Sequence, residues 1–189
     1  MCIRDRLCHE HTFLAQQAVL AQLERALADV GVEFRPIVVP ESRVSLHDAV
    51  RSYLFNGQLV GDRDGRLTLI VPSECREVPS IATWLTEAAE DPANPIERVV
   101  HVDVRESMRN GGGPACLRLC VPMRDDEHPR STVVATPERL DALEAWAVRH
   151  YRERLTPADL ADPSLVRESR TALDELCVML GVGSVYEFQ

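Results

Sequence analysis

One loop of this chain combines residue types that suit nucleophilic chemistry. Asn110 is followed by three consecutive glycines, then by Pro114 and, two residues later, Cys116. Three glycines in a row lose much backbone entropy on folding, so a fold keeps them where the backbone must approach another group closely or adopt a positive φ. Cys116 lies where the loop meets an apolar stretch, residues 115–121, which would fix the direction of a nucleophilic thiol. The spacing alone favours a plainer reading, a tight turn followed by a buried cysteine.

The elements that must position this loop follow an α/β pattern. Helical periodicity, capping residues and prolines predict helices at 13–30, 45–50, 79–89, 136–147 and 162–180, with a short turn of helix at 156–159. Alternating apolar residues predict strands at 34–39, 53–60, 67–71, 98–104 and 115–121, the second and third joined as a hairpin through 61–65. The sequence therefore predicts an α/β protein with a helical C-terminal segment.

Composition restricts the class of protein and of partner. The chain has 189 residues, 45% hydrophobic and 27% charged, which is ordinary for a globular protein of one or two domains. Its net charge of −9 argues against a nucleic-acid partner, because binding a polyanion needs a basic face. No apolar run approaches the ~20 residues that cross a bilayer, and the start lacks the apolar core of a signal peptide. We expect a cytoplasmic protein without a membrane partner.

Cysteines and histidines give little sign of a metal site or of disulfides. The six cysteines lack the spacing of a disulfide framework, so free thiols are expected, with Cys75 and Cys177 in structural roles. Cys8, His9 and His11 form the one short-spaced cluster, and we predict neither a metal nor a cofactor. The remaining histidines are interpreted as surface or packing residues: His47, His101, His128 and His150.

The amino-acid sequence of residues 108–119, which contains the loop, resembles the nucleophile motif of the N-succinylarginine dihydrolases. These enzymes are members of the guanidine-modifying (pentein) superfamily. Further segments resemble the same family in the same order: 44–50, 52–56, 72–77, 105–108, 159–163 and 183–186. The resemblance extends from about Leu7 to Gln189, so it covers packing segments as well as the loop.

The resemblance implies a fold and a reaction. The fold would be a β/α propeller of five pseudo-symmetric modules, of which residues 7–189 would hold roughly the last two as the C-terminal part of a single hydrolase domain. The reaction would convert N2-succinylarginine to N2-succinylornithine, ammonia and carbon dioxide in arginine catabolism. Cys116 matches the family nucleophile and Asn110 a substrate-contacting asparagine, and a homodimer of the full-length protein is compatible with the family.

Residues beside the loop have less specific interpretations. Arg109 and Arg118 flank it and could contact a succinyl carboxylate, although structural ion pairs are at least as compatible with the sequence. Asp103 and Glu106 precede it and are interpreted as solvated carboxylates.

The start of the chain departs from the family pattern. The family's catalytic histidine, in a His-Asn-Asp strand, and its catalytic glutamate lie upstream of the segment that Leu7–Glu10 resembles, so we expect this chain alone to be inactive. Residues 1–6 match nothing in the family and are interpreted as a non-native leader. Two alternatives stay open: another guanidine-modifying enzyme such as a deiminase, and a non-catalytic truncated or binding module.

Overall fold

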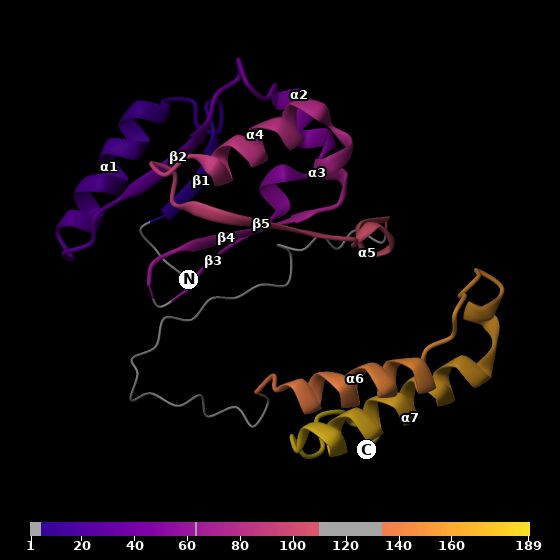
Figure 1. The fold of residues 1–189 in the computed structure, drawn as a ribbon. Helices are drawn as coiled ribbons and strands as arrows, with labels where there is room; N and C mark the ends of the chain where they lie inside the picture. Colours follow the sequence, from indigo (N-terminus) through magenta and orange to yellow (C-terminus); the bar gives the residue numbers. More distant parts are fainter. Residues whose placement is uncertain (1–4, 63, 110–133) are drawn as a thin grey trace. The chain divides into compact units, whose positions relative to one another are not determined.

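The computed structural model describes residues 5–62, 64–109 and 134–189. The chain divides into two compact units, residues 1–122 and 123–189. The first unit contains two small sheets with the helices α1 to α5, and the second contains helices α6 and α7 (Figure 1). This is a mixed α/β protein with a helical C-terminal part, as the sequence predicts.

The first sheet is a parallel pair joined by a helix. Strand β1 (Asp5–His9) leads into α1 (Gln16–Ala28) and then into β2 (Arg35–Val39), with each end of β1 opposite the matching end of β2. Gly31, at a φ of 73°, follows α1 in the left-handed conformation that commonly ends helices. The predicted helix and strand of this region are confirmed, whereas β1 was not predicted.

The second sheet has the order β3-β4-β5, with β3 antiparallel and β5 parallel to β4. Its elements and the helices around it are α2 (Leu46–Arg51), a 3-10 helix (Leu54–Asn56), β3 (Gln58–Gly61), β4 (Leu67–Pro72), α3 (Glu74–Glu77), α4 (Pro79–Glu90), β5 (Ile96–Val102) and α5 (Arg105–Arg109). The β4-α4-β5 segment therefore repeats the parallel strand-helix-strand arrangement of β1-α1-β2.

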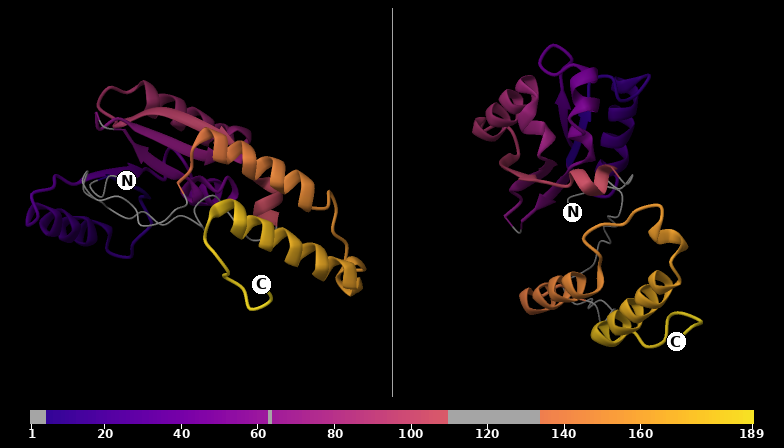
Figure 2. Two further views of the ribbon diagram at one scale, coloured as in Figure 1. Left: turned by 90° about the horizontal axis from the view of Figure 1, so that it is seen from below. Right: turned by 90° about the vertical axis from the view of Figure 1, so that its right-hand side faces the viewer.

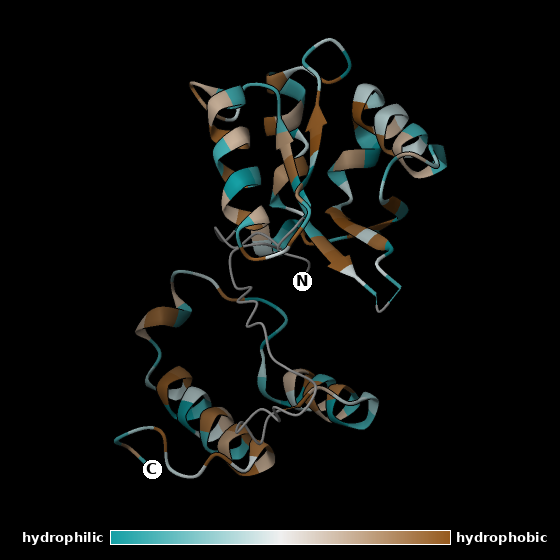
Figure 3. Ribbon diagram, turned by 90° about the vertical axis from the view of Figure 1, so that its left-hand side faces the viewer, coloured by the Kyte–Doolittle hydropathy of each residue, from teal (hydrophilic) through white to brown (hydrophobic). Residues whose placement is uncertain are grey.

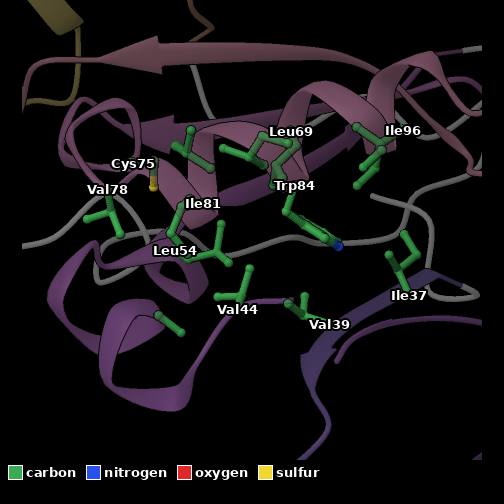
Figure 4. Packing of buried hydrophobic residues seen from close by; sticks show 14 of the residues in the cluster. Ile37, Val39, Val44, Leu54, Leu69, Cys75, Val78, Ile81, Trp84 and Ile96 are labelled. Carbon is green, nitrogen blue, oxygen red and sulfur yellow. The ribbon is translucent and has the colours of Figure 1, made fainter. Parts of the chain in front are cut away.

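One hydrophobic core joins the two sheets of the first unit. Helix α4 buries Ile81, Trp84 and Leu85, which belong to one cluster with Ile37 of β2 and Ile96 of β5 (Figure 4). The strands are largely hydrophobic, whereas the helices carry hydrophilic residues as well (Figure 3). Burial of large apolar side chains is worth ~1.5–3 kcal/mol each, so this core is the main force holding α4 against the strands.

The second unit is a pair of helices, α6 (Pro137–His150) and α7 (Pro163–Leu180), which run side by side (Figures 1 and 2). A 3-10 turn at Asp159–Ala161 precedes α7. The side chains of Thr136 and Asp162 cap the two helices, as the sequence predicts. The Trp146 indole donates a hydrogen bond of 3.0 Å to the Ala172 carbonyl, which fixes α6 against α7.

Several predictions differ from the structure. The strand predicted at 53–60 is wrong for its first half, because Tyr53 adopts a left-handed φ of 54° and starts the 3-10 helix. Helices α3 and α5 were not predicted, since four or five residues are too few to show helical periodicity. The strand predicted at 115–121 lies outside the described residues. The described residues show no propeller, and the five-module arrangement and the single domain over 7–189 stay predictions.

Candidate functional site

The expected nucleophile loop begins directly after α5. Cys116, Asn110 and Arg118 lie outside the described residues, so their predicted roles rest on the sequence. The structure describes the approach to the loop: β5 ends at Val102, and α5 follows and ends at Arg109. In parallel sheets the carboxyl ends of the strands are where ligands bind, and the chain turns toward α5 at that end of β5.

A group of charged side chains surrounds the start of α5. The Arg105 Nε donates a hydrogen bond of 3.2 Å to Glu74 Oε1 in α3, and its Nη2 contacts Glu77 Oε1 in the same helix. The Arg105 backbone amide donates to Asp103 Oδ1 at 3.2 Å. Arg105 thus links the residues that follow β4 to those that follow β5. Sequence reasoning did not identify this link, although two of the family-like segments, 72–77 and 105–108, contain its ends.

Arg109 forms an ion pair within its own helix, and the carboxylates before the loop are exposed to solvent. Both agree with the structural interpretation from the sequence. The Arg109 Nη1 lies 2.8 Å from Glu106 Oε1, three residues earlier in α5, and both side chains are exposed. Asp103 is also exposed and accepts from a backbone amide. Exposed pairs of this kind contribute at most ~1 kcal/mol, so they leave Arg109 available to exchange partners.

His9 is fully engaged in the structure. Its side chain is 1% exposed, and the His11 amide donates to its Nδ1 at 3.1 Å. The ring proton therefore lies on Nε2, which donates to the Val44 carbonyl at 2.9 Å, with Glu41 Oε2 at 3.3 Å. With both ring nitrogens occupied, His9 joins β1 to the segment after β2, and it could act as a base only by losing one of these contacts.

The other described histidines have surface or packing roles. His11 and His47 are exposed, and His47 lies beside Asp48. His150 packs near Trp146 and contacts Glu175 Oε2 at 2.9 Å. Partial burial, with the nearby Arg76 cation, lowers the pKa of His101. These environments agree with the interpretation from the sequence; His128 lies outside the described residues.

The described cysteines are free thiols in protected positions. Cys8, Cys75 and Cys177 are all buried, and burial raises the pKa of Cys8. Burial raises the pKa of Cys75 to about 12, although its Sγ donates to the Ser52 carbonyl at 3.3 Å. The thiolate is the reactive form, so Cys8 and Cys75 are poor nucleophiles near neutral pH, and burial shields the Cys177 thiol from solvent.

Two hollows in the described part of the chain are lined by charged residues. One of about 370 Å³ lies between β2 and α4 and includes Trp84, Arg43 and Glu87, the last two of which contact each other as an ion pair. Another of about 500 Å³, in the second unit, includes Arg152 and Glu168. Both are lined by paired charges, and neither contains a residue that the sequence analysis assigned to catalysis.

Metal and membrane sites are also absent from the described part of the chain. Within residues 5–62, 64–109 and 134–189, no three His, Cys, Asp or Glu side chains gather as metal ligands would. The helices in the same ranges include none with the length and apolarity needed to span a bilayer.

Comparison with known proteins decides the family. A family model described as succinylarginine dihydrolase matches residues 4–189. The chain belongs to the succinylarginine dihydrolase family. The N-succinylarginine dihydrolases of Burkholderia thailandensis and Burkholderia mallei are each 50% identical to it over 189 residues, and that of Paraburkholderia xenovorans is 48% identical over 184 residues.

These succinylarginine dihydrolases are longer proteins. The matches cover 98% of this chain but 42% of the two Burkholderia proteins, and 96% of this chain but 41% of the Paraburkholderia protein. The chain therefore spans about 42% of the length of the first two relatives. The family match includes the loop with Asn110 and Cys116, and it includes β1 from its first residue, Asp5.

Proposed function

We propose that this chain is the C-terminal part of a hydrolase that converts N2-succinylarginine to N2-succinylornithine, ammonia and carbon dioxide, with Cys116 as its nucleophile and Asn110 as a substrate contact. The observation that carries the proposal is the family match over residues 4–189, which includes the glycine-rich loop. The thiols described in the structure support it indirectly, because Cys8, Cys75 and Cys177 are protected by burial.

The chemistry suits a cysteine. A guanidinium carbon is a poor electrophile, and an unperturbed thiol, with a pKa of ~8.5, is mostly protonated near neutral pH. A cationic substrate beside Cys116 favours the thiolate. The thiolate forms a C–S bond to the guanidinium carbon, a proton passes to one terminal nitrogen, and ammonia leaves a covalent thiouronium. Two waters in all are consumed per substrate, with release of two ammonia molecules and one carbon dioxide.

Turnover needs groups that the resemblance assigns to sequence upstream of this chain's match. A histidine would move protons between sulfur, water and the leaving nitrogen, and carboxylates would hold the guanidinium through paired hydrogen bonds. His9 is a poor substitute, because its two ring nitrogens are bonded to His11 and Val44. We therefore expect the 189-residue chain to be inactive alone.

The proposed fold of the longer protein is the five-module propeller of the pentein superfamily. Its support here is the repeat of one arrangement, β1-α1-β2 and β4-α4-β5, each a parallel pair with a crossover helix. In the second repeat β3 pairs antiparallel with β4. A cytoplasmic location and a homodimer of the full-length protein belong to the same proposal.

The test compares this chain with the same chain extended upstream to the length of its relatives. Each is incubated with N2-succinylarginine, and ammonia and carbon dioxide are quantified. We expect two ammonia molecules per substrate from the extended protein only, their loss in Cys116→Ala, and their retention in Cys177→Ala as a matched control.

Three results would contradict the proposal in different ways. One ammonia per substrate without carbon dioxide would indicate a deiminase. Full activity in Cys116→Ala would remove the assigned nucleophile. No turnover by the extended protein would favour the non-catalytic alternative.

A further inference from the structure

The hollow of about 370 Å³ between β2 and α4 has the dimensions of a small-molecule site. Ligand pockets in proteins usually have volumes of ~300–1,000 Å³. Part of the lining is apolar and comes from both elements, with Ile37 and Val38 on β2 and Trp84 and Ala88 on α4. The hollow can therefore bury the apolar body of a ligand, and its polar groups decide which ligand it takes.

The Trp84 indole presents a hydrogen-bond donor to this hollow. Trp84 is 8% exposed, and its Nε1 has no acceptor among the residues that the structure describes. The nitrogen is not one of the fully enclosed polar atoms without a partner in those residues, so it faces the open space that Trp84 lines. In Figure 4 it points away from Ile81, toward the side of the cluster where Ile37 lies.

The other tryptophan of the chain shows the usual arrangement. Trp146 is 7% exposed, and its indole donates to the Ala172 carbonyl at 3.0 Å. Buried indole N–H groups normally have such a partner. The unused donor of Trp84 therefore marks a position for an acceptor oxygen inside the hollow.

The charges around the hollow favour a cationic ligand. Glu87 pairs with Arg43, whereas Asp91 has no ion pair with any residue that the structure describes. Asp91 caps the C-terminal end of α4, where the backbone carbonyls add a partial negative charge and the last turn contains no basic residue. Asp91 Oδ1 accepts from the Ala93 amide at 2.8 Å, which leaves Oδ2 for a ligand.

The donor and the carboxylate lie on one face of α4. Trp84 and Asp91 are seven residues apart, so they are about two turns and ~10 Å apart along the helix axis. A ligand that reaches both needs an acceptor oxygen and a cation joined by several carbon atoms. Lysine, with a four-carbon stem between its backbone and its ammonium, has this pattern when its own carboxylate is replaced by an amide.

We propose that the hollow binds a small cationic amide: a carbonyl oxygen accepts from Trp84 Nε1, an aliphatic stem lies on the apolar lining, and the terminal ammonium approaches Asp91. The inference uses none of the residues assigned to hydrolysis, so it goes beyond the proposed function.

The test titrates N-acetyl-L-lysine methylamide into the ¹⁵N-labelled 189-residue chain and follows its two indole N–H resonances by NMR. We expect the Trp84 resonance to shift and saturate with a Kd of about 1 mM, as suits so small a ligand. The Trp146 resonance is the internal control and should stay in place, because its N–H is bonded to the Ala172 carbonyl. The resonance lost in Trp84→Phe, or retained in Trp146→Phe, assigns the two signals.

Matched probes and variants test the charge separately. N-acetyl-L-norleucine methylamide lacks the ammonium and should bind about threefold more weakly, and N-acetyl-L-glutamate methylamide should bind more weakly still. Asp91→Asn keeps the oxygen that accepts from Ala93 but removes the charge, so the lysine probe should lose its advantage over the norleucine probe. Glu90→Gln, at an exposed neighbour that does not line the hollow, should keep that advantage.

Several results would overturn the inference. The absence of a saturable shift of the Trp84 resonance with the lysine probe would remove the site, and equal shifts of both indole resonances would show non-specific binding. Tighter binding of the glutamate probe, or the same loss of lysine preference in Glu90→Gln as in Asp91→Asn, would remove the assigned ligand class. None of these measurements depends on Cys116 or on hydrolysis, so their failure is distinct from failure of the proposed function.

Discussion

In the first unit, burial and hydrogen bonding make single side chains of reactive types unable to contact a substrate. The His9 ring has both nitrogens bonded and 1% exposure. Cys75 is wholly buried and donates to the Ser52 carbonyl. Such groups stabilise the fold because each buried polar atom has a partner, and the same contacts make them unavailable to substrate.

Replacing His9 should destabilise the protein substantially. His9→Ala leaves the Val44 carbonyl and the His11 amide without their partner and opens a cavity, so we expect the free energy of unfolding to fall by about 2–4 kcal/mol. Urea unfolding measures it. His47→Ala, at an 81% exposed side chain, is the control and should stay within about 0.5 kcal/mol of the parent. Equal effects in the two variants would refute the role given to His9.

Cys75 should make the protein less stable in alkali. Burial raises its pKa in the folded state to about 12, above the ordinary value of 9.0. The unfolded chain therefore loses the Cys75 thiol proton at a lower pH than the folded protein does. The contribution of the protonated thiol to the free energy of unfolding is complete below pH 9.0 and is lost as pH rises toward about 12. Between these values the parent should lose up to about 1.4 kcal/mol per pH unit more than Cys75→Ala. Parallel stability curves for parent and variant would show that Cys75 ionises equally in both states.

At the scale of helices and strands, the sequence predicts those elements whose ends carry a local signal such as a capping side chain or a glycine. The Ser45 hydroxyl accepts from the Asp48 amide at the start of α2, and Gly181 follows α7 at a φ of 65°. Both signals act within a few residues, so the sequence alone displays them. The predicted helix 79–89 is confirmed, and the hairpin predicted between 53–60 and 67–71 is confirmed as the pairing of β3 with β4, which uses the second half of the first predicted strand.

Elements set by tertiary contacts could not be predicted in this way. The left-handed Tyr53 and the 3-10 helix after it lead into Gly57, whose backbone packs closely against Ile70 of β4, and no local sequence pattern records this contact. Glu74 and Arg105 meet through strand pairing, which no local pattern records. The candidate nucleophile, Cys116, was ambiguous from spacing and was identified by the family resemblance.

Gly57 should tolerate no side chain, because it lies where the chain packs against β4. A Cβ there would come within 2.6 Å of the Ile70 carbonyl oxygen and 3.2 Å of the Leu54 carbonyl oxygen, neither of which can move without shifting backbone. We expect Gly57→Ala to lower the free energy of unfolding by about 2–4 kcal/mol. Gly181→Ala meets no atom within 4 Å and should cost only about 1 kcal/mol, from its positive φ. Thermal unfolding that ranks them in the opposite order would contradict this packing.

At the scale of the whole molecule, the chain belongs to the succinylarginine dihydrolase family but spans less than half the length of the relatives it matches. It spans about 42% of the Burkholderia relatives, and the resemblance divides the catalytic groups between this segment and the sequence upstream of it. On the proposed account Cys116 and Asn110 belong to the C-terminal share, in the segment that follows β5 and α5 in sequence. Substrate turnover is then a property of the longer protein.

Trapping the covalent intermediate tests the central claim most directly. The extended protein is mixed with N2-succinylarginine, quenched in acid during turnover, and digested for mass spectrometry. The account predicts that the peptide with Cys116 gains the mass of the substrate less one ammonia, and that Cys116→Ala gains none. Hydrolysis of N2-succinylarginine at an undiminished rate by Cys116→Ala, with no adduct on the parent peptide, would contradict it.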